Sequence, residues 1–159
     1  MASSGNECSE WPAQWPGLTV QQCLEVEPER AAIATVIEWA EQAGAARGWP
    51  PRAVFALTLC VDEALTNILS HARPPEGGQL SIRLMLGQAD WGHVLGISDN
   101  GGEFDPTAQA SAALAATLDE AEIGGHGLRL MRHYLHVFEY RRVDGRNLLL
   151  LGVRREDTP

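Results

Sequence analysis

The stretch VDEALTNILSHA, residues 61–72, carries two patterns at helical spacing. Glu63, Asn67 and His71 follow one another every four residues, so in a helix they lie in one column. This column can supply a base, a metal-ligand oxygen and a polar orienter, or it can be the hydrated flank of a core helix. Beside it runs an apolar stripe of the kind that packs a helix against a core, formed by Leu57, Val61, Ala64, Leu65, Ile68 and Ala72.

The composition is that of a globular protein with one domain. The chain has 159 residues, of which 45% are hydrophobic and 21% are charged, which is enough to bury a core without a large disordered region. Its formal net charge of -9 argues against nucleic acid or an anionic membrane as the main partner, because both attract basic surfaces. An anionic ligand would need local help from backbone N–H groups, a metal ion or a few arginines.

The cysteines and the apolar runs predict a cytoplasmic protein. Cys8, Cys23 and Cys60 are odd in number and show no CxxC spacing, which indicates reduced thiols, with Cys60 in the core. The first residues lack the basic and apolar regions of a signal peptide. No apolar run approaches the roughly 20 residues that span a bilayer.

The order of predicted elements indicates an α+β fold. Residues 1–17 show no periodicity and are interpreted as a loose N-terminal arm, in which only Trp11 and Trp15 hint at docking. Because strands and helices segregate along residues 18–155, we expect a two-layer sandwich: a largely antiparallel, mixed sheet covered on one face by about three helices. Residues 156–159 are a short tail. Strands are predicted at 18–26, 79–86, 91–99, 137–142 and 147–155, helices at 27–44, 51–73 and 125–135, and a lid at about 107–124.

Two glycine-containing segments are candidates for ligand binding. The segment DNGGEFDP, residues 99–106, follows a predicted strand, where it can be an ordinary turn or a binding loop. Asp99 offers an acceptor for an exocyclic amine, and Gly101 would let the backbone approach a flat base. The segment GHG, residues 125–127, opens a helix and could bind a phosphate, although glycines before helices are common. Neither segment is a P-loop or a dinucleotide fingerprint.

Taken in order, these segments resemble a known family. The patterns ExxxNxxxHA at 63–72, DxGxxFDP at 99–106 and GxGL at 125–128 resemble the N, G1 and G2 boxes of the GHKL ATPase superfamily. Within it, EALTN, FDP and GGxGL are similar to the anti-sigma factor serine/threonine kinases of bacterial partner-switching systems. The resemblance runs from about residue 18 to residue 155.

The resemblance implies a Bergerat-type ATP-binding fold, with ATP and Mg²⁺ as ligands. Glu63 would be the general base that accepts the proton of a substrate serine, and Asn67 would bind magnesium. Asp99 would accept a hydrogen bond from the adenine amine. The lid would close on the phosphates. The remaining residues implied at the nucleotide are Gly101, Phe104, Gly125, His126, Gly127 and Leu128.

The resemblance also implies partners. These are a small anti-sigma factor antagonist that is phosphorylated on serine, a sigma factor, and a second copy of the chain in a homodimer. Two alternatives stay open: a catalytically weak ATP-binding switch module, and a detached histidine-kinase ATPase domain. Retention of Glu63 favours the kinase, and the absence of an upstream dimerisation and phosphoacceptor segment argues against the histidine kinase.

Three positions depart from the family pattern. Members often have Asp at the position of His136 and Thr at that of Asn147, and Glu103 replaces the last glycine of a fuller G1 box. Asn147 keeps hydrogen-bonding capacity, so nucleotide binding is still expected. Arg129 can lie near a phosphate or on the solvated surface. The histidines show no metal-ligand spacing, and we expect structural or surface roles for them.

Overall fold

The computed structural model describes residues 8–108 and 126–155. Its helices are α1 (Glu10–Gln14), α2 (Ala31–Ala46), α3 (Pro51–His71) and α6 (His126–Tyr134). Its strands are β1 (Thr19–Val26), β2 (Ile82–Ala89), β3 (Gly92–Asp99), β4 (Val137–Val143) and β5 (Arg146–Arg154). They form one five-stranded sheet in the order β1-β2-β3-β5-β4. The predicted α+β fold is confirmed, with one refinement: every strand pair in the described sheet is antiparallel, so the sheet is not mixed.

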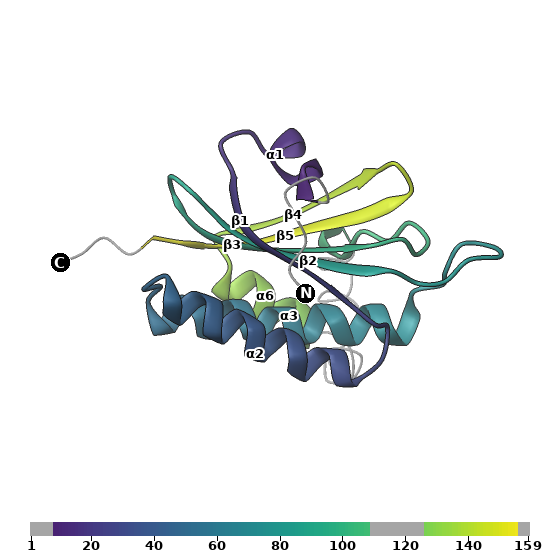
Figure 1. Ribbon diagram of the computed structural model, residues 1–159, viewed down its shortest axis with the longest axis horizontal. Helices are drawn as coiled ribbons and strands as arrows, with labels where there is room; N and C mark the ends of the chain where they lie inside the picture. The colour runs from purple at the N-terminus through teal and green to yellow at the C-terminus, as the bar shows by residue number, and fades with distance from the viewer. Residues whose placement is uncertain (1–7, 109–125, 156–159) are drawn as a thin grey trace.

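One face of the sheet is covered by α2, α3 and α6 (Figure 1). The apolar stripe predicted on α3 forms the centre of this layer, because Leu57, Val61 and Leu65 are at most 1% exposed. Alternate strand residues meet it from the sheet, because successive side chains of a strand point to opposite faces. The residues that contribute from β2 and β3 are Ile82, Leu84, Leu86, Leu95 and Ile97.

The hairpin of β4 and β5 sets the register of β5 against β3, next to the loop that follows β3. Asp144 and Gly145 have φ values of 49° and 77°, as the Asp-Gly signal for a tight two-residue turn predicts. Because this turn sets the register, Asn147 pairs with Arg142 on β4 and with Asp99 on β3. The turn therefore places Asn147 beside the predicted base-binding carboxylate.

The opposite face of the sheet carries the N-terminal segment (Figure 1). Trp11 is 1% exposed and lies on Gly96, where an added Cβ would be 2.5 Å from the indole ring. Trp15 stacks on Trp11 with 5.5 Å between ring centroids, and its Nε1 donates to Glu139. The interpretation of a loose arm is therefore wrong for residues 8–17, because a glycine in β3 leaves room for the buried indole.

Two of the three cysteines are paired. Cys8 forms a disulfide with Cys23 of β1, which ties the N-terminal segment to the sheet and corrects the prediction of three free thiols. Cys60 is free and fully buried in α3. Burial, followed by the nearby charge of Glu63, raises the pKa of its thiol to about 12.

The expectation that no segment could span a membrane also needs correction. Helix α3 has 21 residues and is long and apolar enough to do so by length and composition alone. Core helices share this composition, and the apolar face of α3 packs against the sheet. Its hydrophobicity is thus accounted for by the core.

Candidate functional site

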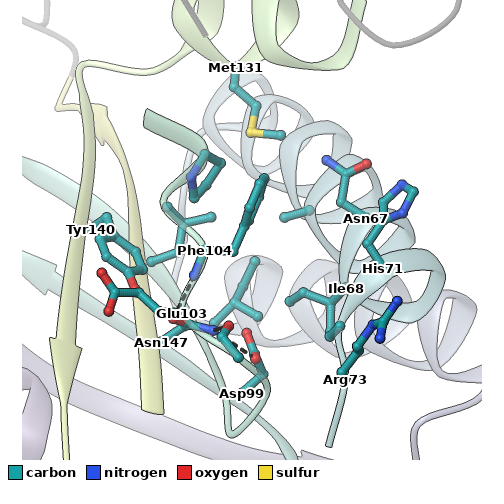
Figure 2. Close-up of a pocket in the computed structure, with 16 residues that line it drawn as sticks. Asn67, Ile68, His71, Arg73, Asp99, Glu103, Phe104, Met131, Tyr140 and Asn147 are labelled. Atoms are coloured by element: carbon teal, nitrogen blue, oxygen red, sulfur yellow. Dashed lines mark hydrogen bonds between the residues drawn. The ribbon is translucent and has the colours of Figure 1, made fainter. Parts of the chain in front are cut away.

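A cavity of about 300 Å³ lies between α3, the loop after β3, α6 and the β4–β5 hairpin (Figure 2). Most of its wall is apolar, with a few polar groups, which is the character of a small-molecule site. The cavity is lined by Ala64, Asn67, Ile68, His71, Ala72, Arg73, Ile97, Asp99, Gly102, Glu103, Phe104, Pro106, Met131, Tyr140, Asn147 and Leu149. Residues from all three predicted boxes or their immediate elements therefore meet in one place.

Helix α3 contributes two of the three residues in its polar column. Asn67 and His71 line the cavity (Figure 2). Glu63 lies one helical turn before Asn67 and is not among the lining residues. Among the described residues, Asn67 and His71 therefore lie on the cavity wall, and Glu63 lies one helical turn nearer the N-terminus of α3.

Asp99 is the last residue of β3 and is only 5% exposed. Its Oδ1 accepts hydrogen bonds from the backbone N–H of Gly101 at 2.9 Å and from Nδ2 of Asn147 at 3.0 Å. Both partners are donors, so Oδ1 of Asp99 is used as a hydrogen-bond acceptor. Asp99 is thus held as an acceptor at the cavity wall.

Gly101 lies behind the cavity wall and allows the loop to approach α3 closely. A Cβ at this position would be 2.9 Å from Oδ1 of Asp99 and 3.0 Å from the Cβ of Ala72. The next N–H, that of Gly102, donates to the carbonyl of Arg73 at 3.1 Å. The glycine is therefore required by packing, and the loop is fastened to the end of α3.

Asn147 is the residue that the sequence interpretation underestimated. Its Nδ2 donates to Asp99 and to the carbonyl of Gly102 at 2.9 Å. Its Oδ1 accepts from Oη of Tyr140 at 2.6 Å, NH1 of Arg142 at 3.0 Å and the N–H of Phe104 at 3.3 Å. The Asp-Gly turn signal could have located it, since the register that follows from this turn brings residue 147 beside Asp99.

Phe104 is 46% exposed, and its ring projects into the cavity (Figure 2). Immediately after it, Oδ1 of Asp105 accepts from the N–H and hydroxyl of Thr107 at 2.9 and 2.6 Å. This is a side-chain cap that starts a helical turn at Pro106. The aromatic ring offers a flat apolar surface next to the acceptor Asp99.

The glycine box lies partly outside the described residues. Gly125 and most of the predicted lid fall in the gap between residues 108 and 126. His126, Gly127 and Leu128 form the first turn of α6, and the structure describes their backbone only. Met131, further along the same helix, lines the cavity. The predicted phosphate contacts therefore stay predictions.

The side chains of the cavity are compatible with a magnesium ion that is bound mainly by the phosphates of a nucleotide. In the described ranges no group of three or more His, Cys, Asp or Glu side chains could hold a metal ion. Mg²⁺ commonly uses one or two protein oxygens and completes its shell with phosphates and water. The side-chain oxygen of Asn67 on the cavity wall fits such a minimal ligand.

His136, at a position where the family often has Asp, lies outside the cavity. It is exposed at the start of the β4–β5 unit, where its ring lies 5.5 Å from that of Trp91 and within 3.1 Å of NH2 of Arg154. His93 is buried against Trp49, and burial lowers its pKa. These two histidines therefore have packing or surface environments.

The fold and the cavity define a histidine kinase-like ATPase domain. Residues 26–152 match that family, so the chain belongs to it, and the resemblance to the GHKL superfamily is confirmed. Among individual proteins, the chain is similar to serine/threonine-protein kinase BtrW of Bordetella bronchiseptica, with 45% identity over 128 residues. The alignment covers 80% of this chain and 89% of that relative. Helix α1 and most of β1 precede the family match.

Proposed function

We propose that this protein is an ATP-dependent protein serine kinase and an anti-sigma factor. Its substrate would be a serine of a small anti-sigma factor antagonist, and phosphorylation would release that antagonist so that a sigma factor is bound instead. The proposal includes a homodimer in the cytoplasm, although the Cys8–Cys23 disulfide removes the argument from free thiols. It is supported by membership of the ATPase family and by the similarity to a serine/threonine-protein kinase.

One observation carries the nucleotide part of this proposal: Asp99 and Asn67 face the same cavity from opposite sides (Figure 2). The adenine amine would donate to Asp99, and the base would lie near the ring of Phe104. The phosphates would extend toward Asn67 and the start of α6, whose backbone N–H groups and helix dipole favour an anion. Local groups would thus accommodate an anionic ligand in a chain of net charge -9.

The transfer step would depend on position more than on covalent chemistry. Mg²⁺, held by Asn67 and the phosphates, would offset their negative charge. Glu63 would accept the hydroxyl proton of the substrate serine as the serine oxygen attacks the γ-phosphorus and the bond to ADP breaks. Glu63 lies one helical turn before Asn67 on α3, so the serine of a second protein would have to approach that part of the helix.

A second function needs only nucleotide binding. ATP would bind through Asp99 and Asn67, which line the cavity, and this binding does not itself require a base. Such a protein would be an ATP-binding switch module that regulates a partner by docking. The two functions differ in whether phosphate is transferred.

The test is incubation of the full chain with γ-labelled ATP, Mg²⁺ and a purified anti-sigma factor antagonist domain. Phosphoserine on the antagonist supports the kinase, whereas ATP binding without transfer supports the switch module. Glu63→Gln keeps the shape of the side chain and removes the base, so it should bind ATP normally and lose at least about 100-fold in transfer rate. Transfer at the parent rate would show that Glu63 is not the base. Asp62→Asn, one exposed residue earlier on α3, is the matched control.

A further inference from the structure

We propose that Arg142 and Asn147 form a hydrogen-bond relay that keeps Asp99 an acceptor and thereby selects a purine with an amino group over one with a carbonyl group. The inference rests on the proposed ATP-binding function and adds specificity residues to it. Asn147 lies on the cavity wall, whereas Arg142 acts through Asn147 and is a positioning residue.

The orientation of the Asn147 amide is determined by five hydrogen bonds. Both N–H groups of Nδ2 are used, one toward Asp99 and one toward the carbonyl of Gly102. Oδ1 faces three donors, from Phe104, Tyr140 and Arg142. If the amide turned over, its oxygen would face two acceptors, and its NH₂ group would face the N–H of Phe104 and NH1 of Arg142, which can only donate. A donor therefore always points at Asp99.

Arg142 sets this orientation because a guanidinium can only donate. NH1 of Arg142 lies 2.8 Å from the carbonyl of Gly101 and 3.0 Å from Oδ1 of Asn147. It thus holds the loop and the amide at the same time. Tyr140 supports it, because burial raises the pKa of this phenol and keeps the hydroxyl protonated. Arg142 thus donates to Asn147, and Asn147 donates to the carboxylate of Asp99.

The relay has a consequence for the base that binds. Adenine carries a donating amino group at the position where hypoxanthine and guanine carry an accepting carbonyl. A carboxylate held as an acceptor pairs with the amino group and repels the carbonyl. Two buried acceptors that face each other without a donor cost more binding free energy than the loss of a hydrogen bond in water. ATP and inosine triphosphate differ at this position of the ring and share their ribose and phosphates. Their affinity ratio therefore measures the relay.

The experiment measures equilibrium dissociation constants of the full chain for ATP and for inosine triphosphate, with Mg²⁺, by calorimetry. For the parent we expect ATP to bind at least about 30-fold more tightly, since a charge-assisted hydrogen bond changes to a repulsive contact. Arg142→Gln can present either an oxygen or an NH₂ group to Asn147, so its ratio should fall about tenfold. Arg142→Lys, which still only donates, should restore the ratio to within about threefold of the parent.

The matched control is Arg141→Gln on the same strand. Arg141 faces the other side of the sheet, where its guanidinium lies 5.1 Å from the ring centroid of Trp15. Its replacement should leave the ratio unchanged. A fall in both affinities by the same factor in Arg142→Gln would indicate general loosening of the loop and would overturn the relay.

The parent measurement separates this inference from the proposed function. Equal affinity of the parent for ATP and inosine triphosphate would overturn the relay while leaving a kinase in place. A parent that prefers ATP but transfers no phosphate would support the relay and remove the kinase. A parent that binds neither nucleotide would overturn both.

Discussion

Replacing Gly101 by alanine should damage the site, whereas the same change at Gly102 should not. A Cβ on residue 101 would lie 2.9 Å from Oδ1 of Asp99 and 3.0 Å from the Cβ of Ala72, both closer than side chains normally pack. At residue 102 no heavy atom lies within 4 Å of the added Cβ. The two substitutions add the same methyl group one residue apart. The difference between their effects on stability and ATP affinity therefore measures the close packing of residue 101 against Asp99 and Ala72.

The expected magnitude follows from the crowded contacts. Inserting a methyl group into a closely packed position costs about 1–3 kcal/mol, and each kcal/mol lowers Tm by about 2–4 °C in a domain of this size. Because the carboxyl group of Asp99 is one of the atoms that must move, we also expect ATP affinity to fall about tenfold. Gly102→Ala should change the free energy of unfolding by less than about 0.5 kcal/mol.

The assay is thermal unfolding of the three proteins, followed by calorimetric titration with ATP and Mg²⁺. Equal Tm values and equal ATP affinities for Gly101→Ala and the parent would refute the packing argument. A Gly102→Ala protein as impaired as Gly101→Ala would refute it as well, because the loss would then come from backbone stiffening in either residue.

Further predictions concern the metal, the back face of the sheet and the buried thiol. Asn67→Ala should abolish the Mg²⁺-dependent part of ATP binding; titrations with and without the metal measure this part, and an undiminished metal effect would exclude Asn67 as the ligand. Trp11→Ala should lower the free energy of unfolding in urea by about 3–5 kcal/mol, because the indole is buried on β3; an unchanged midpoint would mean that the N-terminal segment contributes nothing. The Cys60 thiol has a pKa of about 12 in the folded chain, raised from 9.0, so the unfolded chain loses its proton first and stability should fall as pH rises from 9 toward 12. Cys60→Ala should remove this part of the pH dependence of urea unfolding, and an identical pH profile in both proteins would contradict the assignment.

Local sequence patterns predicted most of the elements because those patterns are produced by local geometry. The period of two placed β2, the turn at residues 88–90 placed β3 next to it, and Asp144-Gly145 placed the last hairpin, with boundaries shifted by a few residues. The start of β2 moved from residue 79 to Ile82, because the N–H of Ser81 donates to the side chain of Asn100 instead of to a strand. Such side-chain competition for the backbone has no periodic signature.

The errors share one physical cause, which is contact between residues far apart in the chain. The sequence predicts a loose N-terminal segment because nothing near Trp11 in the chain indicates that Gly96 leaves space for an indole. The pairing of Cys8 with Cys23 depends on the same docking. The sequence pattern predicts only that Asn147 keeps hydrogen-bonding capacity, because its partner Asp99 lies 48 positions away and is brought beside it by the sheet register.

The sequence by itself thus determined the α+β class, the family, and the three boxes that supply Asn67, Asp99 and the glycines, because each box is a short pattern with its own spacing. The tertiary structure alone decided which of these residues face one cavity and that Arg142 reaches Asp99 through Asn147. Side-chain direction and hydrogen-bond polarity at the site depend on how the strands and α3 are packed together. That packing is a property of the whole chain and is absent from any one motif.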